Sequence, residues 1–495
     1  MPSLFFHNFS GRNLPDYSRE DFNTMHVVNG FIVQTGMQLP CQGGETISVD
    51  LGGATVFAAF ADAHVHFTQT GITLLGCRLE NARSLADILD MVSSATKKNN
   101  FVLGWNMQET RLAEKRLPTL AELDRTGKDA FIWLARADLH SAVANTKALQ
   151  WARSFFPDID PQNALISGER YNFLSYELNR LLPADLKKKA LELAATECFK
   201  NGVGTVHALE GSENSTEETI AAADFFATSP LHGVIYHQSP HADLPKRMNW
   251  NKMGGCLLID GSLGTRTAAL HQNYTDSSSN GCQYLNSEAI DSILKTATHN
   301  GMQLALHAIG DRAIDAATAC YARAALEFGK PALPHRLEHC ILPTAQALAD
   351  ARKAETQICV QPAFDYFWGG ATNLYAQRLG AERALRCNPF KTILLAGLKM
   401  AGGSDSPVTP INPLLGIHAL VNHCNPDERL DLNTALAMFI AEPHTFAGEE
   451  NLRGHLRPTK SADFVCLTKD PFAVPRAKLK DLQIRSLYLG GKKVY

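Results

Sequence analysis

The residues best suited to chemistry are two histidines, His64 and His66, which stand one residue apart just after an apolar run. The run, residues 56–61, is typical of a short strand buried on both faces of a parallel sheet. Because side chains alternate along a strand, the two imidazoles project to the same side and can share one metal ion. A third ligand must come from elsewhere. The pattern alone is weak, since the chain has 18 histidines, and a hydrogen-bonded structural histidine is the alternative.

Three further polar residues stand at the ends of predicted strands in the same way. His307 follows residues 303–306, His339 follows residues 336–338, and Asp405 follows residues 399–404. Taken singly, each has an ordinary structural explanation, a satisfied core histidine or, for Asp405, a helix cap. Five agreeing placements favour a shared site, because a barrel builds its active site from the carboxyl ends of several strands.

The elements that must position these residues are strands that alternate with helices from His64 onward. Residues 84–98 predict an amphipathic helix capped by Ser84, and residues 184–201 predict a helix that ends at Gly202. A further helix is predicted for residues 311–328. Predicted strands cover residues 131–134, 204–208, 256–260, 303–307, 336–339, 358–361 and 399–405. This many β-then-α units indicate an α/β fold of the (β/α)8 barrel type.

Both ends of the chain have a different character. Residues 25–36 are two apolar runs joined at Asn29-Gly30, the strongest short signal for a β-hairpin. Residues 462–467 and 484–495 are again short strand-like runs. We expect the two ends to pair into one small β-domain; two unrelated β-caps are the alternative.

Composition excludes several classes of protein. With 495 residues, 45% hydrophobic and 20% charged, the chain is typical of a soluble globular protein with a large core. The net charge of -3 argues against a nucleic-acid or anionic-membrane surface, and no apolar run reaches the ~20 residues of a membrane span. The 11 scattered cysteines indicate reduced thiols, and hence a cytoplasmic location. No phosphate-binding loop is present.

With these positions assembled, the chain resembles the amidohydrolase superfamily, and within it amidohydrolase family 3, to which N-substituted formamide deformylases belong. The resemblance runs nearly end to end. The motifs that carry it are residues 49–53, 63–66, 104–106, 117–119, 138–142, 260–268, 306–313, 335–339, 403–408 and 461–465.

The resemblance implies a distorted (β/α)8 TIM barrel with a small β-sandwich made from both termini. The composite β-sandwich domain would take residues 1–57 and 445–495, and the hydrolase barrel residues 58–444. A helical insertion, within residues 80–200, would lie over the barrel mouth. Family members are often dimers, so a homodimer is also an expectation.

The resemblance also implies a ligand set. His64 and His66 would bind the more buried metal ion with Asp405, and His307 and His339 would bind the more exposed one. The family often has a bridging lysine four residues before Asp260, where this chain has Cys256. A thiolate there suits zinc, whereas a plain buried cysteine would leave a single metal ion. The expected cofactor is one or two zinc ions.

The expected activity is hydrolysis of a non-peptide carbon–nitrogen bond in a small-molecule amide, with Asp405 as general acid and base. His140 and Arg266 are candidates for substrate contact, although both could be structural. Two alternatives remain. One is a deaminase, which commonly has a glutamate three residues after the His307 position, where this chain has Gly310. The other is a non-catalytic metal-binding barrel.

Three lesser expectations concern residues beside these. Asp311 looks like the cap of the next helix. His207 and Glu210 follow a predicted strand and could lie near the barrel mouth, without an assigned role.

Overall fold

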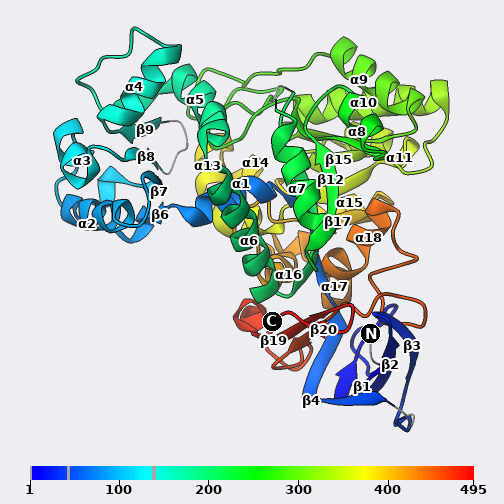
Figure 1. The fold of residues 1–495 in the computed structure, drawn as a ribbon. Coiled ribbons are helices and arrows are strands. Elements are labelled where there is room, and N and C mark those ends of the chain that lie inside the picture. Colours follow the sequence, from blue (N-terminus) through cyan, green and yellow to red (C-terminus); the bar gives the residue numbers. More distant parts are fainter. Residues whose placement is uncertain (1–2, 42–44, 137–140, 214) are drawn as a thin grey trace. The chain divides into compact units, whose positions relative to one another are not determined.

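The computed structural model describes residues 3–41, 45–136, 141–213 and 215–495. The chain divides into two compact units, one made of Met1–Phe67 with Ala195–Tyr495 and the other of Thr68–Ala194. Figure 1 shows their elements, coloured along the chain from blue to red. Among the described residues, no helix combines the length and the apolar composition needed to cross a bilayer.

Strands from the two ends of the chain form one seven-stranded sheet in the first unit (Figure 1). Its spatial order is β20 (Lys492–Lys493), β19 (Ile484–Leu489), β18 (Phe464–Leu467), β4 (Thr46–Ala58), β1 (Ser3–Gly11), β2 (Thr24–Val28) and β3 (Phe31–Gly36). β4 joins the two ends, because it pairs parallel with β1 and antiparallel with β18. The expected pairing of the ends is therefore present. A β-sandwich needs a second sheet facing this one, which the described residues do not show.

The hairpin between β2 and β3 forms where the sequence predicts it. Val28 pairs with Phe31, so Asn29 and Gly30 make a two-residue turn. Their φ angles are 52° and 85°, as a type I′ turn requires, and asparagine and glycine are the residues that adopt positive φ at least cost.

The remaining strands of the first unit are parallel and form two sheets. One has the order β12 (His232–His237), β11 (Val203–Glu210) and β5 (Phe60–Val65). The other has the order β13 (Lys252–Leu258), β14 (Gln303–Ala308), β15 (Arg336–His339), β16 (Gln357–Val360) and β17 (Met400–Gly402). A parallel bridge between Val65 and Ser406 brings the end of β5 beside the segment that follows β17. The hydrogen-bonded sheets by themselves do not close a barrel.

Helices connect these strands and cover them. They are α7 (Glu217–Thr228), α8 (Asp243–Arg247), α9 (Ser287–His299), α10 (Asp311–Phe328), α11 (Ala345–Lys353), α12 (Pro362–Trp368), α13 (Leu374–Leu379), α14 (Ala381–Ala384), α15 (Phe390–Leu395), α16 (Pro413–Val421), α17 (Leu432–Ile440) and α18 (Glu442–Ala447). Every residue of β11, β14, β15 and β16 is buried, so these strands show no alternation of buried and exposed positions, and their polar residues, such as Arg336 and Glu338, are buried as well.

The second unit has a five-stranded sheet of its own, ordered β10 (Leu165–Ser167), β9 (Ser141–Ala144), β8 (Phe131–Arg136), β7 (Phe101–Met107) and β6 (Cys77–Arg78). Its helices are α2 (Leu85–Thr96), α3 (Leu120–Gly127), α4 (Thr146–Phe155) and α5 (Gly168–Leu181), and helices α1 (Phe67–Leu75) and α6 (Ala184–Lys200) cross its limits. The segment is thus α/β rather than helical. The sequence does not predict the two edge strands of this sheet, because β6 and β10 have only two and three residues, too few for a strand pattern. The expected domain limits and the placement of this segment over a barrel mouth stay predictions.

Two helices confirm the ends predicted for them from the sequence. Ser84 caps α2 with a capping box, in which its hydroxyl accepts from the Asp87 amide and the Asp87 carboxylate accepts from the Ser84 amide. α6 ends at Lys200 and is followed by Gly202 at φ 72°.

Candidate metal centre

The six residues expected to bind metal lie together at the carboxyl ends of parallel strands in the first unit. They are His64 in β5, His66 just after β5, Cys256 in β13, His307 in β14, His339 at the end of β15 and Asp405 after β17. Their nitrogen, sulfur and oxygen atoms form three overlapping groups, each with all members within 4.8 Å of one another. Residues 341 positions apart in sequence thus meet in space because the strands that carry them are parallel.

His64, His66 and Asp405 form one side of this centre. Oδ1 of Asp405 lies 3.2 Å from Nε2 of His64 and 3.2 Å from Nε2 of His66. His64 is completely buried and Asp405 nearly so, yet neither His64 Nε2 nor Asp405 Oδ1 makes a hydrogen bond. Buried polar atoms are nearly always satisfied, so these atoms are placed as ligands of a shared cation would be.

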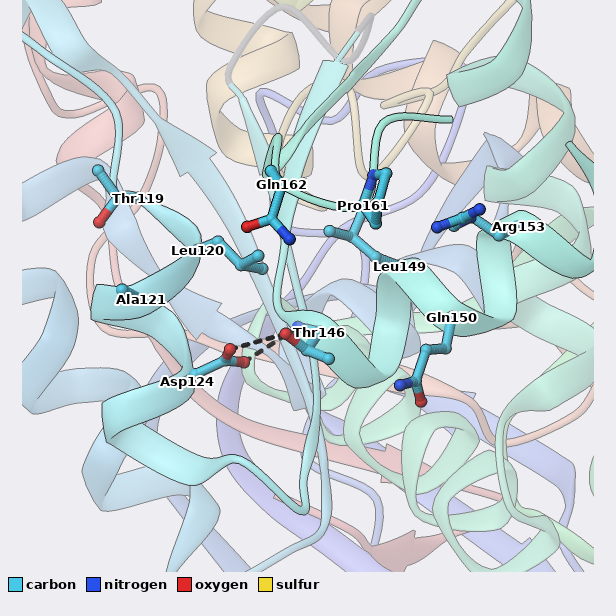
Figure 2. A pocket seen from close by; sticks show the side chains of 10 residues that line it. All are labelled: Thr119, Leu120, Ala121, Asp124, Thr146, Leu149, Gln150, Arg153, Pro161 and Gln162. Carbon is cyan, nitrogen blue, oxygen red and sulfur yellow. Dashed lines mark hydrogen bonds between the residues drawn. The ribbon is translucent and has the colours of Figure 1, made fainter. Parts of the chain in front are cut away.

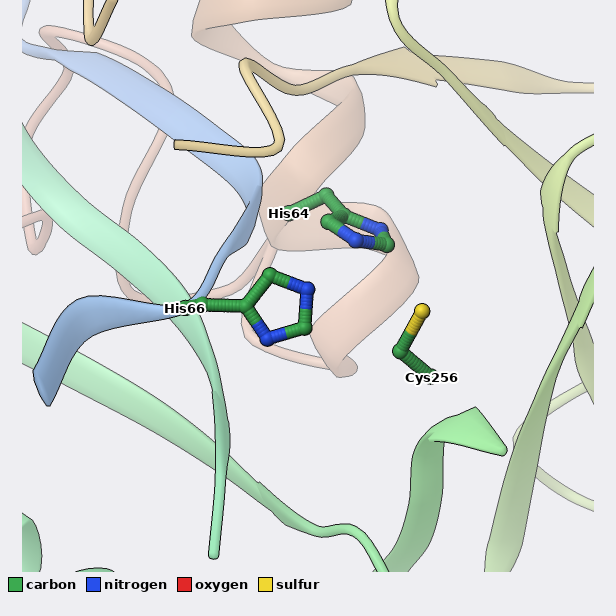
Figure 3. A group of neighbouring side chains, drawn as sticks. All are labelled: His64, His66 and Cys256. Atoms are coloured by element: carbon green, nitrogen blue, oxygen red, sulfur yellow. The ribbon is translucent and has the colours of Figure 1, made fainter. Parts of the chain in front are cut away.

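Cys256 belongs to two of the groups. It forms one with His64 and His66, and another with His307 and His339. Figure 3 shows its thiol and the imidazoles of His64 and His66 pointing toward one another. On the other side, Sγ lies 3.3 Å from Nδ1 of His307 and 3.9 Å from Nε2 of His339. The sulfur therefore lies between the imidazoles of His64 and His66 on one side and those of His307 and His339 on the other.

The electrostatics of the centre favour ionised donors. Burial by itself raises the pKa of Asp405, but the imidazoles of His64, His66 and His339 together outweigh it and hold that pKa well below its usual range. Burial also opposes ionisation of Cys256, yet His307 and its neighbours hold the thiol pKa well below its usual range. Asp405 and Cys256 in turn overcome the burial of His66 and raise its pKa to about 10. A carboxylate and a thiolate here supply the negative charge that a divalent cation needs.

A buried acid orients His64. Oε2 of Glu338 lies 2.6 Å from Nδ1 of His64, and both residues are completely buried. Arg336 donates to both oxygens of Glu338, at 2.9 and 3.0 Å. An imidazole whose Nδ1–H is held by a carboxylate presents Nε2 to the metal in a fixed orientation. Glu338 is not among the site residues expected from the sequence. The only sign of its role in the sequence is an acidic residue inside a buried strand.

Arg336 also anchors the strands below the centre. Its guanidinium donates to Tyr236 Oη at 2.9 Å and to the Ala63 carbonyl at 2.8 Å, and it lies 2.7 Å from His207 Nδ1. His207 therefore lies within β11, not after the end of that strand, and its Nδ1 accepts a hydrogen bond from Arg336 of β15. Glu210, the last residue of β11, accepts from the Phe67 amide at 2.7 Å.

The backbone around the ligands is strained. His339 and Asp405 have φ angles of 72° and 56°, in a region that non-glycine residues rarely adopt. Beside Asp405, Gly403 passes so close to His64 that an added Cβ would lie 2.6 Å from its Cβ and its amide nitrogen. A strained backbone at Asp405 and a glycine at position 403 thus allow Asp405 to approach the histidines.

Asp260 links the loops of the centre through backbone amides. Its carboxylate accepts from Ala269 at 2.8 Å, Ile309 at 3.0 Å and Gly310 at 2.8 Å. These bonds fix the turn that follows His307. Asp260 was recognised as part of a motif, but its role depends on amides up to 50 residues away.

Of the two residues expected to contact substrate, only Arg266 is described, and it is not among the six residues of this cluster. Arg266 makes a two-pronged ion pair with Asp276, at 2.9 and 2.7 Å, which agrees with the alternative that it pins a loop. His140 lies outside the described residues. The expectation for Asp311 is wrong: Gly310 is the N-cap of α10, and Asp311 is its first residue and accepts from the His271 amide at 2.9 Å.

Aromatic side chains of α12 adjoin the centre. The ring of Phe364 stacks on His339 with a centroid distance of 6.1 Å, and Trp368 packs on Phe364 at 4.7 Å. One wall beside His339 is therefore apolar.

The second unit has a separate pocket of about 580 Å³ between α3 and α4, shown in Figure 2. It is lined by Thr119, Leu120, Ala121, Asp124, Thr146, Leu149, Gln150, Arg153, Pro161 and Gln162. Asp124 is bonded to the amide and hydroxyl of Thr146. With no histidine or cysteine among these residues, the pocket lacks the donor set of the metal centre.

The fold and the cluster define an α/β protein with a candidate metal centre at the carboxyl ends of parallel strands. Comparisons with known proteins show the family to which such a protein belongs. A model of the amidohydrolase family matches residues 48–495. YtcJ of Bacillus subtilis is 27% identical over 489 residues, 91% of each chain. N-substituted formamide deformylase of Arthrobacter pascens is 23% identical over 486 residues, 90% of this chain and 89% of its own. A metal-dependent hydrolase from Pyrococcus horikoshii has a TM-score of 0.82 and 23% identity, over 96% of this chain and 99% of its own.

The chain therefore belongs to the amidohydrolase family. This confirms the resemblance found in the sequence motifs, and the structural likeness supports a common fold over nearly the whole length.

Proposed function

We propose that this protein is a metal-dependent hydrolase of a non-peptide carbon–nitrogen bond in a small linear or cyclic amide. The observation that carries the proposal is the pair of buried atoms, His64 Nε2 and Asp405 Oδ1, that face each other at 3.2 Å without a hydrogen bond. A relative named for deformylation of N-substituted formamides, a reaction at such a bond, supports the class of substrate.

The proposed architecture is a distorted (β/α)8 barrel, with the three- and five-stranded sheets as two arcs of one barrel. The bridge from Val65 to Ser406 supports this closure, because it connects β5 of one arc to the end of β17 of the other. The active site then takes its usual place at the carboxyl ends of the strands.

The proposed cofactor is zinc, with one or two ions per chain. His64, His66 and Asp405 would hold one ion, and His307 and His339 the other, with Cys256 between them. Nitrogen, oxygen and thiolate donors together suit zinc better than magnesium or calcium, which prefer oxygen alone. Zinc bound there lowers the pKa of a water from ~15.7 to about 7 and polarises the carbonyl group.

The chain's own residues do the rest of the chemistry. Asp405 is ionised, and its Oδ1 faces the histidines, so its other oxygen is free to take a proton from the attacking water and return it to the leaving nitrogen. Glu338 keeps the His64 imidazole in one orientation during turnover. The apolar wall of Phe364 and Trp368 favours a substrate with an apolar group next to the scissile bond.

The same residues give less support to the two alternatives, a deaminase and a non-catalytic metal-binding barrel. The position where deaminases commonly carry a glutamate is Gly310, whose amide is bonded to Asp260, so no acid is available there. The complete set of six donors, Asp405 among them, argues against a non-catalytic metal-binding barrel.

Zinc content per chain tests the proposal first. Protein purified without chelator and kept reduced is compared with Cys256→Ala by elemental analysis. Two zinc ions that fall to one or none in the variant establish the bridging thiolate, and one ion in both leaves a mononuclear hydrolase. No stoichiometric metal in either protein overturns the proposal. A panel of N-substituted formamides and cyclic amides, with His66→Ala as the inactive control, then tests the substrate class.

A further inference from the structure

A second cluster of donors lies apart from the six residues of the centre and is independent of the proposed function. Asp365 lies in α12, and His423 and Cys424 follow the end of α16. One ligand atom from each lies within 4.8 Å of the others. Asp365 is 3% exposed and His423 is completely buried, whereas Cys424 is only partly buried.

The geometry of His423 and Asp365 repeats that of the metal centre. Nε2 of His423 lies 3.2 Å from Oδ1 of Asp365, the same separation as in the pair of His64 and Asp405. Nε2 of His423 also makes no hydrogen bond, although it is fully buried. Two ligands held at ~2.0–2.1 Å from one tetrahedral zinc ion are about 3.3 Å apart, so this spacing fits a shared cation.

The other donor atoms around His423 are arranged for ligation. Nδ1 of His423 lies beside two backbone groups of Asn425, the amide, which donates to it at 3.0 Å, and the carbonyl oxygen at 3.1 Å. When Nε2 binds a metal ion, Nδ1 carries the proton and donates to that carbonyl oxygen instead. Oδ2 of Asp365 accepts from the Cys424 amide at 2.9 Å, which turns Oδ1 toward His423. The carboxylate and the imidazole are thus both held in position from behind.

Cys424 completes the donor set. Its thiol donates to Oδ1 of Asp365 at 2.7 Å, so the sulfur lies on the same oxygen as the imidazole. A bound cation takes the place of the thiol proton, which passes to solvent, and the sulfur becomes a thiolate ligand.

We propose that Asp365, His423 and Cys424 bind a zinc ion at a second site, distinct from the centre around His64. Imidazole, carboxylate and thiolate donors select zinc among the common divalent cations. The partly exposed side of Cys424 leaves the fourth position to water. The ion fastens α12, which carries Phe364 beside the metal centre, to the loop after α16.

Zinc stoichiometry tests the site. Wild type, His423→Gln and Cys424→Ser are loaded with Zn²⁺, freed of loosely bound metal and measured by elemental analysis. Cys466→Ser is the matched control, because Cys466 is a buried cysteine of β18, outside the proposed site. We expect one zinc ion fewer per chain in the two site variants than in wild type and in the control. Equal content in all four proteins overturns the proposal, whatever the occupancy of the centre around His64.

Crystals of the wild-type protein provide a test that needs no variant. Anomalous scattering at the zinc edge should give a peak within about 2.0–2.3 Å of His423 Nε2, Asp365 Oδ1 and Cys424 Sγ. A zinc-loaded crystal without that peak contradicts the proposal. Hydrolysis by His423→Gln is expected to stay within a few-fold of wild type, since His423 is no part of the proposed catalytic machinery.

Discussion

Glu338 and His64 form a buried carboxylate–imidazole pair across 274 residues of sequence, with Oε2 2.6 Å from Nδ1. Arg336 neutralises the carboxylate from the other side. The pair fixes which imidazole nitrogen faces Asp405, and so decides whether the two residues can share a metal ion.

Glu338→Gln is expected to lower zinc affinity by about 10–100-fold, because an amide holds the imidazole less firmly than a carboxylate. It also leaves Arg336 as an uncompensated buried charge, which lowers the free energy of unfolding by about 3–5 kcal/mol. Competition with a zinc-binding dye, well below the unfolding temperature, measures the first effect.

Its matched control is Glu428→Gln. Glu428 is also a buried acid of the first unit, but it bonds to the amide and hydroxyl of Thr392. Unchanged affinity in Glu338→Gln, or an equal loss in both variants, would contradict a positioning role for Glu338.

Asp405→Asn is expected to abolish turnover, with a loss of at least about 10²–10⁴-fold in kcat, because an amide oxygen is a far weaker base than a carboxylate. Circular dichroism should show an intact fold. The control is Asp311→Asn, whose carboxylate accepts backbone amides outside the cluster and should leave kcat nearly unchanged. Near-full activity of Asp405→Asn would contradict the proposed role of Asp405 as general acid and base.

Arg266→Met is expected to have a small effect. It breaks one partly exposed ion pair, so it should lower the free energy of unfolding only slightly and leave KM unchanged, whereas Asp276→Asn also breaks the ion pair of Asp276 with Arg378 and should lower that free energy further. Thermal unfolding and steady-state kinetics check the two parts. A rise in KM confined to Arg266→Met would show that Arg266 contacts substrate.

Gly403→Ala is expected to weaken zinc binding and lower stability, because the new methyl group would lie 2.6 Å from His64 and displace it. Gly264→Ala is the control, since its nearest neighbour would be 3.6 Å away and its φ is not in the left-handed region. Zinc titration and thermal unfolding of the two variants should therefore separate them. Similar behaviour of both would mean that the contact at Gly403 has little effect.

Stability is expected to fall in mild acid because of buried neutral histidines. Burial lowers the pKa of His335 from 6.5 to about 4, and its Nδ1 accepts from the Leu304 amide at 3.1 Å. Between these values the unfolded chain binds a proton that the folded protein does not, so this contribution is complete above pH 6.5 and is lost as pH falls toward 4.

Urea unfolding at pH 7, 6 and 5 measures the effect. Replacing His335 by Asn should reduce the slope of unfolding free energy against pH by about 1.4 kcal/mol per unit within this window. An unchanged slope would mean that His335 takes up its proton in the folded state as readily as in the unfolded chain.

The sequence by itself determined the features that depend on near neighbours. The Ser84 capping box, the Asn29-Gly30 turn and the His64-x-His66 pair follow from spacings of one to three residues, which fix local geometry whatever the rest of the chain does. The apolar run of residues 304–306 likewise located β14, because a strand buried on both faces carries no polar alternation.

Only the tertiary structure decided which distant groups meet. The bond from Glu338 to His64, the ion pair of Arg266 with Asp276 and the cluster of Asp365 with His423 depend on strand register and loop paths. Asp311 shows the limit at short range, since its carboxylate accepts from the distant His271 amide as well as from the adjacent Arg312 amide, while Gly310 takes the N-cap position. A side chain's type states what it can bond to, but the packing of the whole chain selects its partner.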